Sequence, residues 1–157
     1  MSAPDLPAIR ELAERNIPHS LFVHTGPVHS LEQAASERDQ RPEQVVRSLL
    51  FRLAEDDFAL VLVAGPRQIP WKTLRTFFKQ RRLTLASEEE VLRVTGYEIG
   101  TVSPFGLATP IPTYIDESVL ANEELSLGSG RRGTAILMHS RDLLLALPTA
   151  TRINLFS

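Results

Sequence analysis

Two dense apolar segments stand near the middle of the chain, separated by a short acidic turn. VVRSLLFRL (residues 45–53) and FALVLVA (residues 58–64) are rich in valine, leucine and phenylalanine, and Glu55, Asp56 and Asp57 lie between them. Branched and aromatic side chains favour strands, and a polar turn between two such runs is typical of a hairpin. The pattern predicts a β-hairpin at the centre of a sheet.

Shorter apolar segments predict further strands on both sides of this hairpin. We expect them at residues 17–23, 83–86, 112–116, 124–127 and 134–139. Helical spacing of apolar residues predicts helices at residues 8–15, 31–37, 71–80, 88–94 and 141–147, and Pro42 begins a brief further helix. Ser30 (in a capping box with Gln33), Ser87 and Ser140 are the predicted N-caps, and Gly96 ends the helix over 88–94.

This order of elements does not match the regular alternation of a doubly wound sheet. We therefore predict a single α/β domain over residues 1–157, with a mixed, curved, barrel-like β-sheet and helices packed outside it. In the helix over 71–80, the apolar residues Leu74, Phe77 and Phe78 are expected to face the core.

The composition is that of an ordinary globular protein. Of the 157 residues, 43% are hydrophobic and 23% are charged. The absence of cysteine excludes disulfides, thiolate metal sites and cysteine nucleophiles. The longest apolar run has seven residues, whereas a membrane helix needs about 20. The first residues, MSAPDLPAIRELAE, lack the basic-then-apolar order of a secretory signal. We expect a cytoplasmic protein without a membrane segment.

Positive charge is concentrated in one stretch, although the formal net charge is −2. No acidic residue lies between Asp57 and Glu88. Six basic residues do: Arg67, Lys72, Arg75, Lys79, Arg81 and Arg82. Three of them, Lys72, Arg75 and Lys79, share one face of the helix predicted over 71–80. Such a patch attracts phosphate groups. The alternative is a solvated face that is paired with acids elsewhere in the fold.

A glycine-rich segment, TGYEIGTVSPFG (residues 95–106), follows the helix predicted over 88–94. Gly96, Gly100 and Gly106 can adopt backbone conformations that side chains forbid, and Pro104 fixes one dihedral. We interpret the segment as a shaped loop whose main-chain N–H groups are free to bind a ligand. The alternative is an ordinary connection between two elements.

Two other features carry candidate chemistry. GSGRRG (residues 128–133) joins two predicted strands, and its two arginines and Ser129 could bind a phosphate. The alternative is a tight hairpin with exposed arginines. Arg47 lies among core residues of a predicted strand, where its guanidinium needs a cavity mouth, a carboxylate or a ligand. Asp116, at the end of its strand, is a candidate partner, and an exposed Arg47 is the alternative.

Several other classes of site are excluded because their motifs are missing. The four histidines do not have the spacing of a helical metal motif. The chain contains neither a phosphate-binding G-x-x-x-x-G-K-[ST] loop nor a G-x-S-x-G nucleophile motif. We therefore expect no metal and no cofactor, and neither a standard hydrolase triad nor a nucleotide-hydrolysing domain.

Four blocks together resemble the YbaK/prolyl-tRNA-synthetase-associated domain family of free-standing aminoacyl-tRNA deacylases. VVRSLLF resembles the family's strand with a basic residue, and ASEEEVLRVTGYEIGTVSPFG resembles its short helix and G-x-x-x-P loop, here residues 100–104. PTYIDESV resembles the strand that ends in aspartate, and LSLGSGRRGTAI resembles the turn rich in glycine and arginine. The resemblance covers roughly residues 20–147.

The resemblance implies this family's fold and its activity, which is hydrolysis of the ester between a wrongly attached amino acid and a tRNA. The substrate implied is tRNA for proline carrying a small residue. An aminoacyl ester is already activated, so a protein need only position water or a substrate hydroxyl and stabilise the oxyanion. The implied partners are the 3′ end of aminoacyl-tRNA and an aminoacyl-tRNA synthetase, with the protein a monomer or a weak homodimer. The alternatives are a catalytically silent module that binds tRNA 3′ ends and an adaptor that docks on a synthetase.

The resemblance also assigns roles by position. The catalytic loop comprises Gly100, Thr101, Val102, Ser103 and Pro104. The substrate pocket comprises Arg47, Asp116, Ser129 and Gly130. We expect the tRNA to contact Lys72, Arg75, Lys79, Arg131 and Arg132. Arg47 stands where the family usually has lysine, and arginine stays protonated, so it cannot serve as a base.

Overall fold

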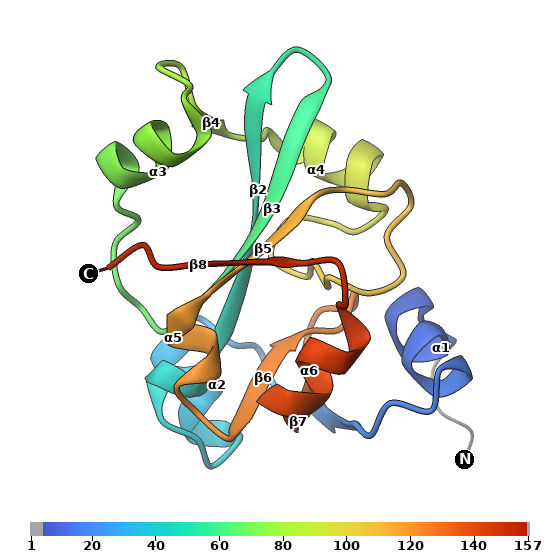
Figure 1. Cartoon of the computed structure of the whole chain (residues 1–157). Helices are drawn as coiled ribbons and strands as arrows, with labels where there is room; N and C mark the ends of the chain where they lie inside the picture. Colours follow the sequence, from blue (N-terminus) through green and yellow to red (C-terminus); the bar gives the residue numbers. More distant parts are fainter. Residues whose placement is uncertain (1–4, 157) are drawn as a thin grey trace.

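The computed structural model describes residues 5–156, and within that range the strands form two sheets (Figure 1). The smaller sheet is antiparallel, in the order β1 (Ser20–Val23), β7 (Thr134–His139) and β6 (Glu124–Gly128). The larger sheet has the order β4 (Thr84–Leu85), β2 (Val46–Ala54), β3 (Asp57–Ala64), β5 (Thr113–Asp116) and β8 (Thr151–Ile153). A parallel bridge between Val45 and Ser126 joins the two sheets.

The larger sheet is mixed. β2 pairs antiparallel with β3 and β4, whereas β5 pairs parallel with both β3 and β8. The predicted α/β class with a mixed sheet and flanking helices is therefore confirmed. The sheets do not close into a barrel, because β4 and β8 end one sheet and β1 and β6 end the other.

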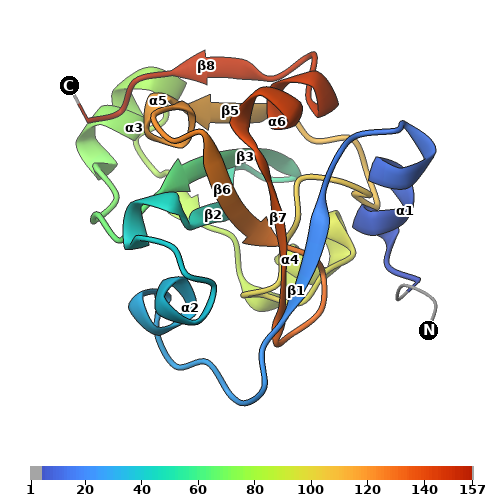
Figure 2. The ribbon, with the colours of Figure 1, turned by 90° about the horizontal axis from the view of Figure 1, so that it is seen from below.

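Helices flank these sheets. In chain order they are α1 (Pro7–Glu14), α2 (Leu31–Glu37), a 3₁₀ turn (Pro42–Gln44), α3 (Trp71–Phe78), α4 (Glu88–Thr95), α5 (Glu117–Leu120) and α6 (Ser140–Ala146). In both views α1 and α2 lie on opposite sides of the smaller sheet (Figures 1 and 2). No helix between residues 5 and 156 combines the length and the apolar character needed to span a bilayer.

The predicted central hairpin is present, with β2 and β3 aligned from the Val46–Ala64 pair to the Ala54–Asp57 pair. β3 is buried from Phe58 onward because both faces of the larger sheet are covered. On one face, every second residue of β3, including Leu60 and Leu62, packs against residues of β6, β7 and several helices. On the other face, Val61 and Val63 pack against Leu74 of α3 and against β8. A strand buried on both faces reads as a continuous apolar run.

The helix caps follow the prediction at two of three positions. Ser30 accepts a hydrogen bond from Gln33 N–H, and Ser87 forms a reciprocal capping box with Glu90. The predicted box at Ser30 is displaced by one residue, because the Gln33 side chain accepts from His29 N–H instead. The predicted Ser140 cap is wrong: α6 begins at Ser140, and the preceding residue, His139, is the N-cap without a side-chain bond.

The prediction for α3 is wrong in two respects. Leu74 is buried and Phe78 is half-buried, but Phe77 is 41% exposed. The helix ends at Phe78, and Lys79 adopts a left-handed conformation with φ +56°. Lys79 therefore lies just beyond the helix whose basic face it was expected to extend. Neither α5 nor β8 follows from the sequence pattern, because both are too short to show a period.

Candidate active site

A cavity of about 630 Å³ opens where five parts of the fold meet. They are α2 with the segment before it, the first half of β2, β4 with the first half of α4, the glycine-rich loop, and the turn between β6 and β7. The edge of β2 is accessible here because β4 pairs only with Phe51 and Arg52, farther along the strand. The fold thus brings together three segments that are far apart in the sequence and were each predicted to carry site residues: the strand with Arg47, the glycine-rich loop and the GSGRRG turn.

The charged side chains that line the cavity are all positive. Four arginines line it, namely Arg38, Arg47, Arg131 and Arg132, and none of the lining residues is aspartate or glutamate. Much of the remaining wall is apolar, including Leu31, Val45, Leu50, Val91 and Leu127. A concave surface with one sign of charge and low-dielectric walls concentrates ligands of the opposite charge. The cavity therefore suits an anionic ligand with apolar parts.

The glycine-rich loop is held from behind by buried side chains. The Thr95 hydroxyl donates to the Val91 carbonyl at 2.6 Å and accepts from Tyr97 N–H at 3.0 Å. The Tyr97 hydroxyl donates to the Phe105 carbonyl at 2.5 Å, and burial raises the pKa of Tyr97 to about 12. Tyr97 therefore remains a donor at neutral pH. Together with Gly96, whose φ of +83° ends α4 as predicted, these bonds fix both ends of the loop.

The main-chain amides of the loop are not equivalent. Thr101 N–H donates to the Glu98 carbonyl at 3.0 Å and is therefore occupied. The N–H groups of Gly100 and Val102 have no acceptor within residues 5–156, and both residues line the cavity. Ser103 N–H also has no acceptor there, but Ser103 is fully buried and does not line the cavity. Of the four loop amides, only those of Gly100 and Val102 belong to cavity-lining residues and also lack an acceptor in the described residues, which makes them the candidates for binding a ligand oxygen.

The turn after β6 packs against the loop through two glycines. Gly130 N–H donates to the Thr101 carbonyl at 2.8 Å. A Cβ at Gly128 would lie 2.2 Å from the Val102 carbonyl oxygen, and one at Gly130 would lie 2.5 Å from the Tyr97 ring. Because side chains are excluded at both positions, the loop and the turn can approach closely enough to form one wall.

Arg47 reaches the cavity from β2 and is half-buried. Its Nη2 donates to the Arg67 carbonyl at 2.6 Å, whereas its Nε is buried without a partner in the described part of the chain. Burial lowers the pKa of Arg47. The neighbouring Ser48 Oγ, also in the cavity lining, is likewise buried and unpaired. Unpaired buried polar atoms are rare in native proteins and indicate a place where a ligand or water completes the bonding.

No ion pair joins Arg47 and Asp116 within residues 5–156. Asp116 is 1% exposed, and its two carboxylate oxygens accept from the N–H groups of Ser118 and Leu155 at 3.0 and 2.8 Å. It caps α5 and fixes the segment after β8, and it does not line the cavity. The predicted pairing of Arg47 with Asp116 is therefore wrong, because both carboxylate oxygens of Asp116 accept hydrogen bonds from main-chain N–H groups.

Four other predicted site residues do not line the cavity: Ser103, Pro104, Ser129 and Gly130. The Ser103 hydroxyl accepts from Phe105 N–H at 3.3 Å, within the loop. The Ser129 hydroxyl bonds the Thr134 hydroxyl and the main chain of Arg131. In this structure these residues shape the loop and the turn, and their contact with a substrate stays a prediction.

The residues predicted to contact tRNA fall into two groups. Arg131 and Arg132 line the cavity, and Arg132 Nε also lies 3.4 Å from a carboxylate oxygen of Glu98. The second group is exposed on α3 or directly after it and comprises Lys72, Arg75 and Lys79. All six cations of the 67–82 stretch are exposed, and none of them forms an ion pair with any residue from 5 to 156. Acids elsewhere in that range thus do not pair with this stretch.

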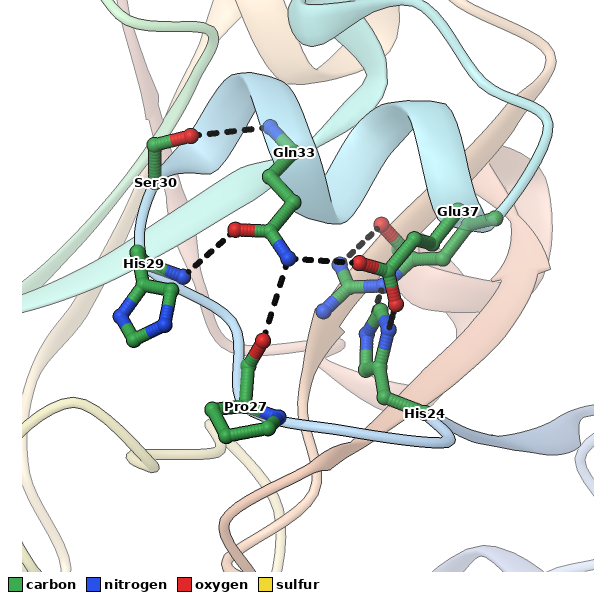
Figure 3. A network of polar contacts seen from close by, with 8 residues as sticks. His24, Pro27, His29, Ser30, Gln33 and Glu37 are labelled. Atoms are coloured by element: carbon green, nitrogen blue, oxygen red, sulfur yellow. Dashed lines mark hydrogen bonds and ion pairs between the residues drawn. The ribbon is translucent and has the colours of Figure 1, made fainter.

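Two residues of the cavity, His24 and Arg38, were not among the predicted site residues. The His24 side chain is 1% exposed; its Nδ1 lies 2.8 Å from Glu37 Oε1, and its Nε2 lies 3.1 Å from Arg38 Nε. Because a guanidinium N–H can only donate, Nε2 is the acceptor and Nδ1–H donates to Glu37, so the ring is neutral. This bond lowers the pKa of Glu37, and Gln33 donates a second bond to the same carboxylate (Figure 3).

The cavity offers no evident general base. None of its lining residues carries a carboxylate, and both nitrogens of His24 are engaged. No group of three or more histidine, aspartate or glutamate side chains able to hold a metal ion is found within residues 5–156. What the described residues can supply is an oriented set of N–H donors and positive charge, the means by which an oxyanion is stabilised.

Comparison with known proteins gives concordant results. A family model for the aminoacyl-tRNA editing domain matches residues 25–145. YwhH, an uncharacterised protein of Bacillus subtilis, is 38% identical over 116 residues, which cover 73% of this chain and 72% of YwhH. The proline–tRNA ligase of Kosmotoga olearia is 30% identical over 112 residues, which cover 71% of this chain but only 19% of the ligase.

Among solved structures, a candidate trans-editing enzyme for prolyl-tRNA synthetase superposes with a TM-score of 0.85 and 28% identity, over 98% of each chain. The family model covers well over half of the chain, and YwhH is matched over most of its length. The resemblance inferred from the four sequence blocks is therefore confirmed, and the chain belongs to the aminoacyl-tRNA editing domain family.

Proposed function

We propose that this protein is a proofreading deacylase that hydrolyses the ester of a wrongly charged tRNA, with tRNA for proline carrying a small amino acid as its substrate. The observation that carries the proposal is one cavity in which two unoccupied amides, those of Gly100 and Val102, share the wall with Arg47. Family membership supports a proofreading role, and the likeness to proline–tRNA ligases supports the choice of tRNA.

The proposed mechanism relies on positioning and electrostatics. The ester carbonyl points at the Gly100 and Val102 amides, which stabilise the oxyanion formed when water or a substrate hydroxyl attacks. Arg47 holds the terminal nucleotide at the rim through the guanidinium N–H groups that are not used in its bond to the Arg67 carbonyl. Because arginine stays protonated, its role is electrostatic, and no residue of the chain acts as a base in this scheme.

The tRNA body is proposed to follow the exposed basic stretch. Arg47 contacts the Arg67 carbonyl, so the cavity rim adjoins the segment that leads into α3 and its unpaired cations. These residues provide weak, salt-sensitive phosphate contacts. We further propose that residues 1–157 act as a single editing domain in the cytoplasm. The chain spans about a fifth of the proline–tRNA ligases it matches, so their ligase activity is not part of the proposal.

Deacylation of mischarged tRNA tests this function. Incubation with tRNA for proline charged with alanine, cysteine or serine is expected to release at least one of these amino acids well above the uncatalysed rate. If none of these esters is hydrolysed faster than the uncatalysed rate, the proposal is contradicted. Binding of the same tRNAs without hydrolysis would instead support the silent binding module, for which the arginine at position 47 is the motivating observation.

Gly100→Val provides the matched loop variant for this assay. Gly100 has φ +86°, a conformation that a branched side chain rarely adopts, yet the nearest atom to an added Cβ is Arg132 Nη1 at 3.7 Å. The variant is therefore expected to fold, while its altered amide lowers the hydrolysis rate by about 10²-fold or more. Full turnover by a folded Gly100→Val protein would remove the loop from the mechanism.

A further inference from the structure

Arg38, directly after α2, presents part of its guanidinium to the cavity without a protein partner. Its Nε donates to His24 Nε2 at 3.1 Å, and its Nη1 donates to the Ser126 hydroxyl at 2.9 Å. A guanidinium carries five N–H groups, so three remain, one on Nη1 and two on Nη2. No acceptor for them is found within residues 5–156, although Arg38 is half-buried.

The orientation of Arg38 is fixed by a chain of hydrogen bonds. Neutral His24 accepts from Arg38 and donates to Glu37, and Gln33 Nε2 donates both to Glu37 at 2.8 Å and to the Pro27 carbonyl at 3.1 Å (Figure 3). Ser126, fully buried in β6, holds the other side of the guanidinium. A side chain held in this way loses little conformational entropy when it binds a ligand.

No acidic residue lines the cavity, although Glu37, which is bonded to the same histidine as Arg38, acts on the charge of this guanidinium from outside the lining. The other charged lining residues are Arg47, Arg131 and Arg132. Nη2 keeps two free N–H groups and Nη1 keeps one, so the guanidinium can still donate more than one hydrogen bond to a planar or tetrahedral oxyanion. We propose that Arg38 forms an oxyanion-binding subsite, which takes a carboxylate or a phosphate of the bound ligand.

This inference rests on the proposed function for the identity of the ligand. The charged end of a tRNA offers two sources of an oxyanion. One is the phosphate of the terminal nucleotide, and the other is a side-chain carboxylate on the attached amino acid. In the second case the subsite would select aspartyl or glutamyl esters over their amide analogues.

Matched, uncleavable probes separate the two sources by calorimetric titration. The first pair is adenosine and adenosine 5′-monophosphate, and the second is adenosine carrying amide-linked aspartate or asparagine at its 3′ position. For the wild-type protein, the anionic member of one pair is expected to bind about tenfold or more tightly than its neutral partner. Arg38→Gln should abolish that preference.

Arg41→Gln is the matched control, because Arg41 is three residues away, bonds Asn122 on the surface and does not line the cavity. It should retain the wild-type preference. If Arg38→Gln does not fold, Arg38→Lys replaces it: lysine keeps the charge but lacks the planar set of guanidinium donors, so the preference should fall.

Equal affinity for both members of both pairs in the wild type would overturn the inference. So would a preference that survives in Arg38→Gln or is unchanged in Arg38→Lys. Because the probes are not cleaved, a wild-type protein that hydrolyses no aminoacyl-tRNA would contradict the proposed function and leave this result intact.

Discussion

Gly128→Ala is expected to reduce ester hydrolysis by about 10²-fold or more, because it displaces the wall that carries the Val102 amide. The added Cβ would lie 2.2 Å from the Val102 carbonyl oxygen and 2.9 Å from the Thr101 carbonyl oxygen, both of them main-chain atoms. Main-chain atoms cannot move aside as the end of a flexible side chain can, so the loop itself must shift. We expect an accompanying loss of about 1–3 kcal/mol in the free energy of unfolding.

Gly26→Ala is the matched control for stability. Gly26 does not have a positive φ, and no atom lies within 4 Å of an added Cβ. Thermal unfolding of Gly26→Ala should therefore match the wild type, whereas Gly128→Ala should unfold at a lower temperature. A Gly128→Ala protein with wild-type hydrolysis and stability would show that the loop and the turn are not packed as described.

Arg47→Met is expected to lower activity without lowering stability. It removes the guanidinium that is proposed to bind the terminal nucleotide, and loss of a charged hydrogen bond should lower kcat/KM by about 10- to 100-fold. Methionine keeps much of the apolar volume and removes a half-buried, incompletely paired charge, so the free energy of unfolding should not fall. Steady-state hydrolysis and urea unfolding measure the two effects.

Arg52→Met is the control on the same strand. Arg52 does not line the cavity, and its Nε lies 3.5 Å from Glu90 Oε2 on the surface. Its removal should leave hydrolysis unchanged and alter stability by less than about 1 kcal/mol. Undiminished hydrolysis by Arg47→Met would mean that the cavity recognises its ligand without this residue.

Much of the fold could be predicted because local pattern and burial agree. The β2–β3 hairpin follows from two apolar runs and an acidic turn, and α4 follows from Ser87 at its start and Gly96 at its end. The error at Ser140 is a shift of one residue at the start of α6. The extended conformation continues to His139, so the helix begins at the residue that was expected to cap it. β8 has three residues and is defined by its pairing with β5, which no local pattern reveals.

The site was predicted in part, for a physical reason. Arg47 and the loop were conspicuous in the sequence, because an arginine among core residues and closely spaced glycines both need an explanation. The sequence could not show which loop residues line the cavity, since Gly100, Thr101 and Val102 do so while Ser103 and Pro104 do not. Asp116 looked like a ligand residue, yet its carboxylate serves two main-chain amides.

One signal for Arg38 was present in the sequence. Leu31, Ala34 and Arg38 follow a helical spacing of i, i+3 and i+7, so an arginine occupies the apolar face of the helix predicted over 31–37. The same reasoning that drew attention to Arg47 would have applied. Its partners could not be identified in that way, because His24 and Ser126 are 14 and 88 residues distant in the chain.

The most direct test of the central claim is a crystal structure with an uncleavable alanyl-adenosine mimic. The account predicts that the mimic occupies the cavity lined by Arg47, with its carbonyl oxygen about 3 Å from the amide nitrogen of Gly100 or Val102. A mimic bound elsewhere on the protein, or one whose carbonyl oxygen points away from both amides, would contradict it.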